Sequence, residues 1–299
     1  MRFYNQVLQR SLEITQSKPV DLRVLVSEKY EYPSLGIDEY GKVMRIPKPV
    51  KQKEGYALDG LIFKNDEIGR TLLMRTVMAS IEHLSVHAVI SDFTLYNNWL
   101  RNKDPRTGVF VIDLIEDQCV KLYAKSKLKG LLQNMALANA VSYAALTPRE
   151  RINSTQYLIQ SALLSYFIAG RYRFMLPTTM KKDVLTILAS LHNFEKNILN
   201  RKDHHGSWWL DKDVKDVKLK LADAIASRLE KYGTPKEMAF LPYTDAHAQV
   251  ERVNEELTLE LMRSIDIFSD TFRNLGLQLT SDKSVQAVLG KSLREEASN

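Results

Sequence analysis

Two histidines four residues apart give the clearest chemical signal in the sequence. His83 and His87 lie within a long helical pattern of apolar residues. Residues four apart lie on one face of an α-helix, so both imidazoles can turn towards a single ion. Glu116 and Asp117 follow in a second helical pattern, and a carboxylate from a neighbouring helix is a common third ligand of zinc. The spacing therefore predicts a site for zinc or another divalent metal.

The residue that follows the first histidine argues against ordinary metallopeptidase chemistry. In the hydrolytic motif His-Glu-x-x-His, a glutamate at that position acts as general base on a metal-bound water. Leu84 occupies the position in this sequence. A metal-dependent hydrolase would need Glu82 or Asp117 as its base. Glu82 projects roughly 100° away from His83 around the helix, so we expect it to face a basic neighbour rather than to act as a fourth ligand. A hydrolase of this kind is one alternative hypothesis for the function of the protein.

Another alternative hypothesis for the function needs no metal. Each imidazole of such a pair can simply form a hydrogen bond with a carboxylate or a carbonyl in the core. The chain would then be a helical interaction protein with a basic surface. Its formal net charge is +6, but 36 acidic residues are interspersed with 42 basic ones, so charge alone does not support nucleic-acid binding. The densest basic group surrounds one helix end, where the helix dipole favours lysine anyway; it consists of Lys121, Lys125, Lys127 and Lys129.

Composition and missing motifs exclude several classes of protein. Cys119 is the single cysteine, so an intramolecular disulfide is impossible and a cytoplasmic location is expected. The first ten residues lack the apolar run of a secretory signal. The sequence contains neither a P-loop nor a Gly-x-Gly-x-x-Gly segment, so any ATPase involved would be a partner.

The local patterns predict a mainly α fold, a helical bundle with a small N-terminal β element. Residues 1–66 show a short helix over 5–16 and extended runs over 21–27, 42–46 and 56–63, separated by glycines and prolines. We expect a small sheet there. Residues 67–299 form the helical part, which can also be continuous with the N-terminal part as one domain.

Helical periodicity dominates this second part of the chain. Helices are predicted over 67–93, 109–127, 130–148, 153–170, 180–200, 211–232, 246–275 and 284–295. The stretches 130–148 and 153–170 contain no charged residue, but glutamines, asparagines and serines interrupt both. Buried helices of a bundle explain them better than membrane spans. The apolar run that precedes Glu116 and Asp117 predicts a partly buried carboxylate, which needs a cation, a metal or a hydrogen-bond donor.

Three segments together carry a resemblance to a known group. These are Ile81-Glu-His-Leu-Ser-Val-His87, Ser91-Asp-Phe93 and Leu114-Ile-Glu-Asp-Gln-Cys-Val120. They resemble the zincin-like N-terminal helical region of the NorD-type nitric-oxide-reductase activation proteins and the CobT-type cobaltochelatase group, over about residues 60–130. The resemblance implies zincin-like core helices, with His83, His87 and Glu116 as metal ligands. It also implies that Asp117 orients an imidazole from outside the ligand set.

The same resemblance implies the biological setting. Members of the group combine this helical region with a von Willebrand A domain that works with an AAA+ ATPase. This chain has no Asp-x-Ser-x-Ser segment of the kind that binds metal in a von Willebrand A domain, so that partner would come from another chain. In members of the group an Ala-Arg pair usually follows the Glu-Asp pair. In this sequence Gln118 and Cys119 occupy those two positions. The expected function is therefore a non-proteolytic accessory or scaffold module for an ATPase-linked maturation or remodelling system.

One further pair of histidines precedes two tryptophans. His204 and His205 belong to a polar turn that ends in Trp208 and Trp209. Such a turn can contact a ligand or a partner, but an exposed loop anchored by its aromatic residues is the commoner case.

Overall fold

The computed structural model describes residues 2–15, 22–30, 33–53, 55–58, 61–128, 131, 134–135, 138, 149–169, 172, 174–201, 206–235 and 239. The described residues fall into two compact units. Unit 1 comprises those within 1–85 and 130–145, and unit 2 comprises those within 86–129 and 146–240. The change from strand to helix patterns near residue 66 lies inside unit 1, and one long helix runs from unit 1 into unit 2.

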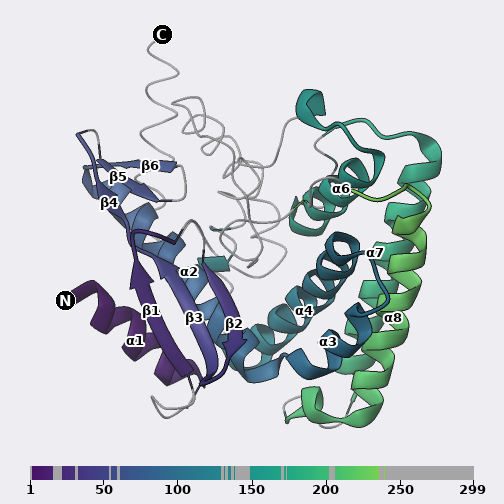
Figure 1. The fold of residues 1–299 in the computed structure, drawn as a ribbon, viewed down its shortest axis with the longest axis horizontal. Coiled ribbons are helices and arrows are strands. Elements are labelled where there is room, and N and C mark those ends of the chain that lie inside the picture. Colours follow the sequence, from purple (N-terminus) through teal and green to yellow (C-terminus); the bar gives the residue numbers. More distant parts are fainter. Residues whose placement is uncertain are drawn as a thin grey trace. The chain divides into compact units, whose positions relative to one another are not determined.

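Unit 1 begins with helix α1 (Arg2–Thr15), which contacts the first strand of a three-stranded sheet (Figure 1). The strands are β1 (Leu22–Ser27), β2 (Ser34–Asp38) and β3 (Gly41–Pro47), in the order β1-β3-β2. β1 runs parallel to β3, and β2 runs antiparallel to it. The β2–β3 turn ends at Gly41, whose φ of 110° favours glycine.

A second small sheet follows in unit 1. It consists of β4 (Val50–Lys51), β5 (Gly55–Leu58) and β6 (Leu61–Lys64), all antiparallel in that order. The stretch 56–63, which we expected as one strand, is thus a hairpin. Its sequence contains Asp59-Gly60, a pair favoured in hairpin turns. The expected single sheet is therefore two sheets.

Helix α2 (Glu67–Ile90) carries both histidines of the predicted site. The carboxylate of Asp66 accepts a hydrogen bond of 2.7 Å from the backbone N–H of Gly69 and so caps its first turn. The second half of the helix is buried nearly all round, including Leu84 and Ser85. A helix segment that is buried on every side needs no polar face, and residues 79–90 contain Glu82 as their single acidic residue and neither lysine nor arginine.

Two capped helices follow in unit 2. Asp92 accepts from the backbone N–H of Leu95 at the start of α3 (Phe93–Leu100), a short helix that the sequence pattern did not predict. Asp104 caps α4 (Pro105–Lys127) in the same way. α4 begins four residues earlier than the predicted 109. Its proline occupies the first turn, where the missing N–H costs no intrahelical hydrogen bond.

The remaining helices complete unit 2. They are α6 (Thr155–Ala169), α7 (Thr178–Leu199) and α8 (Lys212–Glu230), with short 3₁₀ turns at Arg149–Arg151 and Trp208–Leu210. α4 packs against α7 and α8, and α6 also packs against both of them (Figure 1). α6 is the uncharged, buried helix that the sequence predicts at 153–170.

The mainly α fold class with a small N-terminal β element is confirmed. The predicted helices over 246–275 and 284–295, most of 130–148, and His204, His205 and Lys129 lie outside the described residues. Within the described ranges, no helix combines the length and apolar character that crossing a membrane requires.

Candidate metal centre

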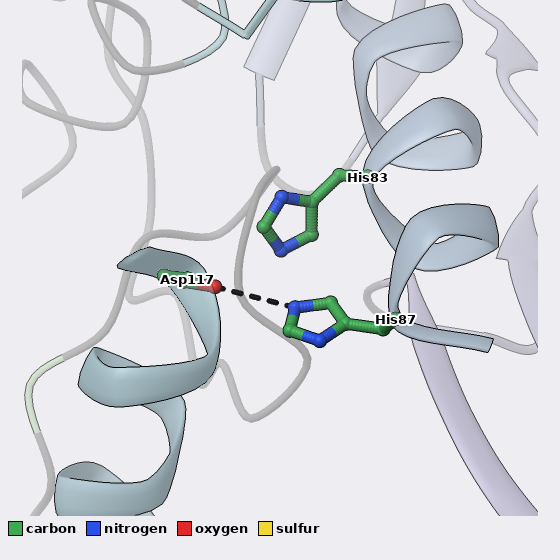
Figure 2. Close-up of side chains that lie close together, drawn as sticks. All are labelled: His83, His87 and Asp117. Atoms are coloured by element: carbon green, nitrogen blue, oxygen red, sulfur yellow. Dashed lines mark hydrogen bonds and ion pairs between the residues drawn. The ribbon is translucent and has the colours of Figure 1, made fainter. Parts of the chain in front are cut away.

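His83, His87 and Asp117 form one group of side chains that could hold a metal ion. Each residue offers one ligand atom, and the three atoms lie within 4.8 Å of one another. Figure 2 shows both imidazoles leaving α2 on the same side, one turn apart, with Asp117 opposite them on α4. The i, i+4 spacing thus places the histidines as the sequence predicts. Both His83 and Asp117 are buried.

The contact between His87 and Asp117 has the spacing of a metal site. Nε2 of His87 lies 3.3 Å from Oδ1 of Asp117 (Figure 2). Two ligands about 2.1 Å from a tetrahedral zinc ion are about 3.4 Å apart. The distance between these two ligand atoms therefore fits zinc. The two ligand atoms that lie farthest apart, at no more than 4.8 Å, would have to approach each other by about 1.4 Å at most. A nitrogen, nitrogen and oxygen donor set suits zinc among the common divalent metals.

Glu116, which we expected as the third ligand, is held by other groups. Lys218 donates to its Oε1 at 2.7 Å, and Ser91 donates to its Oε2 at 2.7 Å. The hydroxyl of Tyr96 also donates to Oε1. Among the described residues it does not belong to the group around the histidines. The structure brings Asp117 to that position instead. Adjacent helical residues point about 100° apart, so one faces the histidines while the other faces α8.

The environment of Glu116 keeps it ionised. Burial alone would raise its pKa, but the charge and hydrogen bond of Lys218, with the bonds from Tyr96 and Ser91, lower the pKa below its usual value. Burial also opposes the charge of Lys218, yet the proximity of Cys119 and Glu116 raises the pKa of the ammonium. The buried carboxylate predicted from the sequence thus has a cation as its partner.

Cys119 lies beside this ion pair and does not act as an anion. Burial raises the pKa of its thiol to about 12, even though Lys218 works in the opposite direction. The thiol is therefore protonated at neutral pH, and Glu116 is the anion that keeps Lys218 charged. Cys119 is buried, which also makes it a poor nucleophile.

Glu82, a candidate base for the hydrolase hypothesis, is engaged elsewhere in unit 1. Arg10 of α1 donates to its Oε1 from Nε at 2.8 Å and from Nη2 at 2.6 Å. Asn134 donates to the other carboxylate oxygen at 2.9 Å. Both oxygens of this carboxylate thus already accept hydrogen bonds from other side chains. Its contacts match a structural role that joins α1 to α2.

Comparisons with known proteins do not assign a family. No family model, curated protein or solved structure gives a significant match to this chain. The NorD-type and CobT-type resemblance therefore remains a hypothesis that rests on the quoted segments.

Other sequence candidates have local explanations. Lys125 pairs with Glu195 of α7, and Nζ of Lys121 lies 5.5 Å from the ring centre of Phe167. These contacts satisfy two of the four lysines within the protein, which agrees with a helix-end role rather than a phosphate-binding surface. Trp208 of the 3₁₀ turn Trp208–Leu210 is buried and makes an edge-on contact with Trp209.

Three residues around the site escaped the sequence analysis as functional candidates: Ser91, Tyr96 and Lys218. Lys218 carried a usable signal, because it stands in the apolar stripe of α8 between Val214 and Ala222, both buried. A lysine in such a stripe needs a buried anion. The sequence could not indicate which anion, since Glu116 lies 102 residues away.

Proposed function

We propose that this chain is a metal-binding helical module in which His83, His87 and Asp117 hold a divalent cation, zinc being the best fit. The observation that carries the proposal is the convergence of three ligand atoms from two helices to within 4.8 Å. Two neutral imidazoles and one carboxylate leave room for water or a fourth ligand on a tetrahedral ion. In this proposal Asp117 takes the ligand role that the sequence assigned to Glu116.

The metal has a structural role in this proposal. The position of the usual general base holds Leu84, which is buried. Glu82 is paired with Arg10, and Asp117 is itself a ligand, so neither is placed to activate a metal-bound water. The ion would join α2 to α4. A three-ligand site of this kind adds its binding free energy to that of folding.

The biological setting is proposed from the resemblance. We place the module in a reducing, cytoplasmic setting, as an accessory or scaffold protein that docks a partner in an ATPase-linked maturation or remodelling system. Its partner would be a von Willebrand A and AAA+ ATPase pair supplied by other chains. A pull-down with such a pair, with and without zinc, tests this part separately from metal binding.

Metal stoichiometry tests the central proposal. The purified full-length chain is loaded with zinc, dialysed and examined by elemental analysis, beside the double variant His83→Ala/His87→Ala and the isosteric variant Asp117→Asn. We expect about one zinc per wild-type chain and none in the double variant. His192→Ala is the matched control, because this side chain on α7 is 60 % exposed. Zinc in neither wild type nor control would overturn the proposal.

Turnover separates the structural role from the hydrolase hypothesis. Zinc-loaded protein is assayed with peptide and ester substrates. We expect zinc without turnover. Turnover in the wild type that disappears in Glu82→Gln or Asp117→Asn, while the variant retains its zinc, would instead establish a hydrolase with a non-standard base.

A further inference from the structure

We propose that α8 fastens the connector between the two ligand-bearing helices and thereby limits the rate at which the metal is released. The connector consists of residues 91–104 and contains α3. It leads from the end of α2, which carries His87, to the start of α4, which carries Asp117. The proposal rests on the metal-binding function above and extends it by naming the residues that control release. Its contacts all lie within unit 2.

The first fastening holds the start of α3. Oδ1 of Asp92 accepts a hydrogen bond from the backbone N–H of Leu95 and so caps the helix. Nζ of Lys215 on α8 lies 2.8 Å from the other oxygen, Oδ2. One carboxylate thus caps α3 and joins its first turn to α8.

The second fastening holds the other end of α3 and the turn that follows it. Oδ1 of Asp223 on α8 accepts a hydrogen bond of 3.0 Å from Nε1 of Trp99, and it also lies 3.0 Å from Nζ of Lys103. The same ammonium lies 5.2 Å from the centre of the Trp99 ring, within the range of a cation–π contact. A single carboxylate of α8 therefore binds two residues of the connector, which also contact each other.

The arrangement of the two fastenings suits a connector that is held along its whole length. They lie about two helical turns apart along α3 and about two turns apart along α8, so each helix uses about the same face for both. The end of α3 also packs closely on α4. A Cβ at Gly108 of α4 would lie 2.5 Å from Cδ2 of Leu100, so glycine permits this close approach.

Release of the ion requires movement of the ligands that these contacts restrain. A bound ion leaves only when His87 or Asp117 moves away from it. The connector restrains that movement, because it joins the two residues through a short segment that is fastened at both ends. Transient detachment of α3 from α8 would let the two ligands separate. The rate of zinc release should therefore follow the frequency of this local opening.

Hydrogen exchange and zinc release measure these two quantities in the full-length protein. Amide exchange over residues 93–100 of the metal-free chain, followed by mass spectrometry, reports the opening of α3. Transfer of zinc from the loaded chain to an excess of a coloured chelator reports release. We expect Asp223→Asn to speed both processes by a similar factor, about 3–10-fold. Trp99→Phe keeps an aromatic ring and removes the N–H donor, so both processes should change in the same direction by a smaller factor.

Two control variants separate the fastening from a general loss of stability. Asp216→Asn removes an exposed carboxylate of α8 that takes part in neither fastening, and it should change neither rate. Asp183→Asn weakens contacts of α7 with Arg228 and Tyr232. It should lower the free energy of unfolding and leave the rate of zinc release unchanged.

The outcomes distinguish this proposal from the proposed function. Zinc release at the wild-type rate in Asp223→Asn, or unchanged exchange of α3 in that variant, would overturn the role of the fastenings. Equally fast release in Asp183→Asn and Asp223→Asn would do the same, because stability alone would then set the rate. A wild-type chain that takes up no zinc would overturn the proposed function, on which this inference depends.

Discussion

Replacement of Lys218 by methionine removes a buried charge and keeps most of the volume of the side chain. In the wild type its ammonium lies 2.7 Å from Glu116, and both side chains are 3 % exposed. Without it, Glu116 retains two hydroxyl donors, from Tyr96 and Ser91. A buried carboxylate without a cation takes up a proton, so the cost of the variant is limited by the free energy of protonation.

That limit can be calculated and depends on pH. Protonation of a carboxyl group with an unfolded-state pKa of about 4.3 costs about 4 kcal/mol at pH 7 and about 1 kcal/mol at pH 5. Breaking a buried ion pair costs about 3–5 kcal/mol in other proteins, in agreement with the first value. In the variant the pKa of Glu116 is raised above its unfolded value, so stability falls as the pH rises above about 4.3.

The complementary variant Glu116→Gln has the opposite pH dependence. It leaves the ammonium of Lys218 buried without its anion, and loss of that proton costs about 5 kcal/mol at pH 7 but about 2 kcal/mol at pH 9. Its stability should therefore rise with pH. The double variant contains neither charge and should be more stable at pH 7 than either single variant.

Tryptophan fluorescence during urea unfolding measures these effects in the metal-free protein. The three tryptophans of the sequence, Trp99, Trp208 and Trp209, all belong to unit 2, which also contains the ion pair. Nζ of Lys218 lies 6.0 Å from the ring centre of Trp208, so the signal also reports on its surroundings. Destabilisation by Lys218→Met that is equal at pH 5 and pH 7 would refute the reasoning. A double variant less stable than both single variants would do the same.

Two other contacts give independent predictions. Tyr232 and Arg228 donate to Asp183 at 2.7 and 3.0 Å, and the bond from Tyr232 is the main cause that lowers the pKa of Asp183. Asp183→Asn should lower the free energy of unfolding by about 1 kcal/mol at pH 7. Because the folded pKa is lowered, the difference should vanish as the pH falls through it, and urea unfolding across the acid range checks this. Glu82→Gln weakens the hydrogen bond from Arg10 and should speed amide hydrogen exchange in α1 without loss of zinc. Unchanged hydrogen exchange together with loss of zinc would show instead that Glu82 acts in the metal site.

The elements that the sequence predicts best are those whose signals are local. α6 and α8 follow their apolar patterns to within two residues, because helix periodicity and burial agree along the whole of each segment. The start of α4 was placed too late. Its cap, Asp104, and its first residue, Pro105, resemble a loop in composition but are favourable at a helix start.

The site was predictable only in part, for a geometric reason. Spacing within one helix fixes the relation of His83 to His87. Neither spacing nor composition fixes the rotation of α4 about its axis, which decides whether Glu116 or Asp117 faces the histidines. That rotation depends on packing against α7 and α8. The burial of Lys218 next to Glu116 belongs to the same tertiary arrangement, which joins residues 102 positions apart.

Anomalous diffraction at the zinc absorption edge, from crystals of the zinc-loaded full-length chain, tests the central claim most directly. We predict one strong peak within coordination distance of His83, of Nε2 of His87 and of Asp117, with Glu116 still bonded to Lys218. A peak elsewhere in the molecule, or zinc-loaded crystals in which the His87–Asp117 contact holds no peak, would contradict the claim.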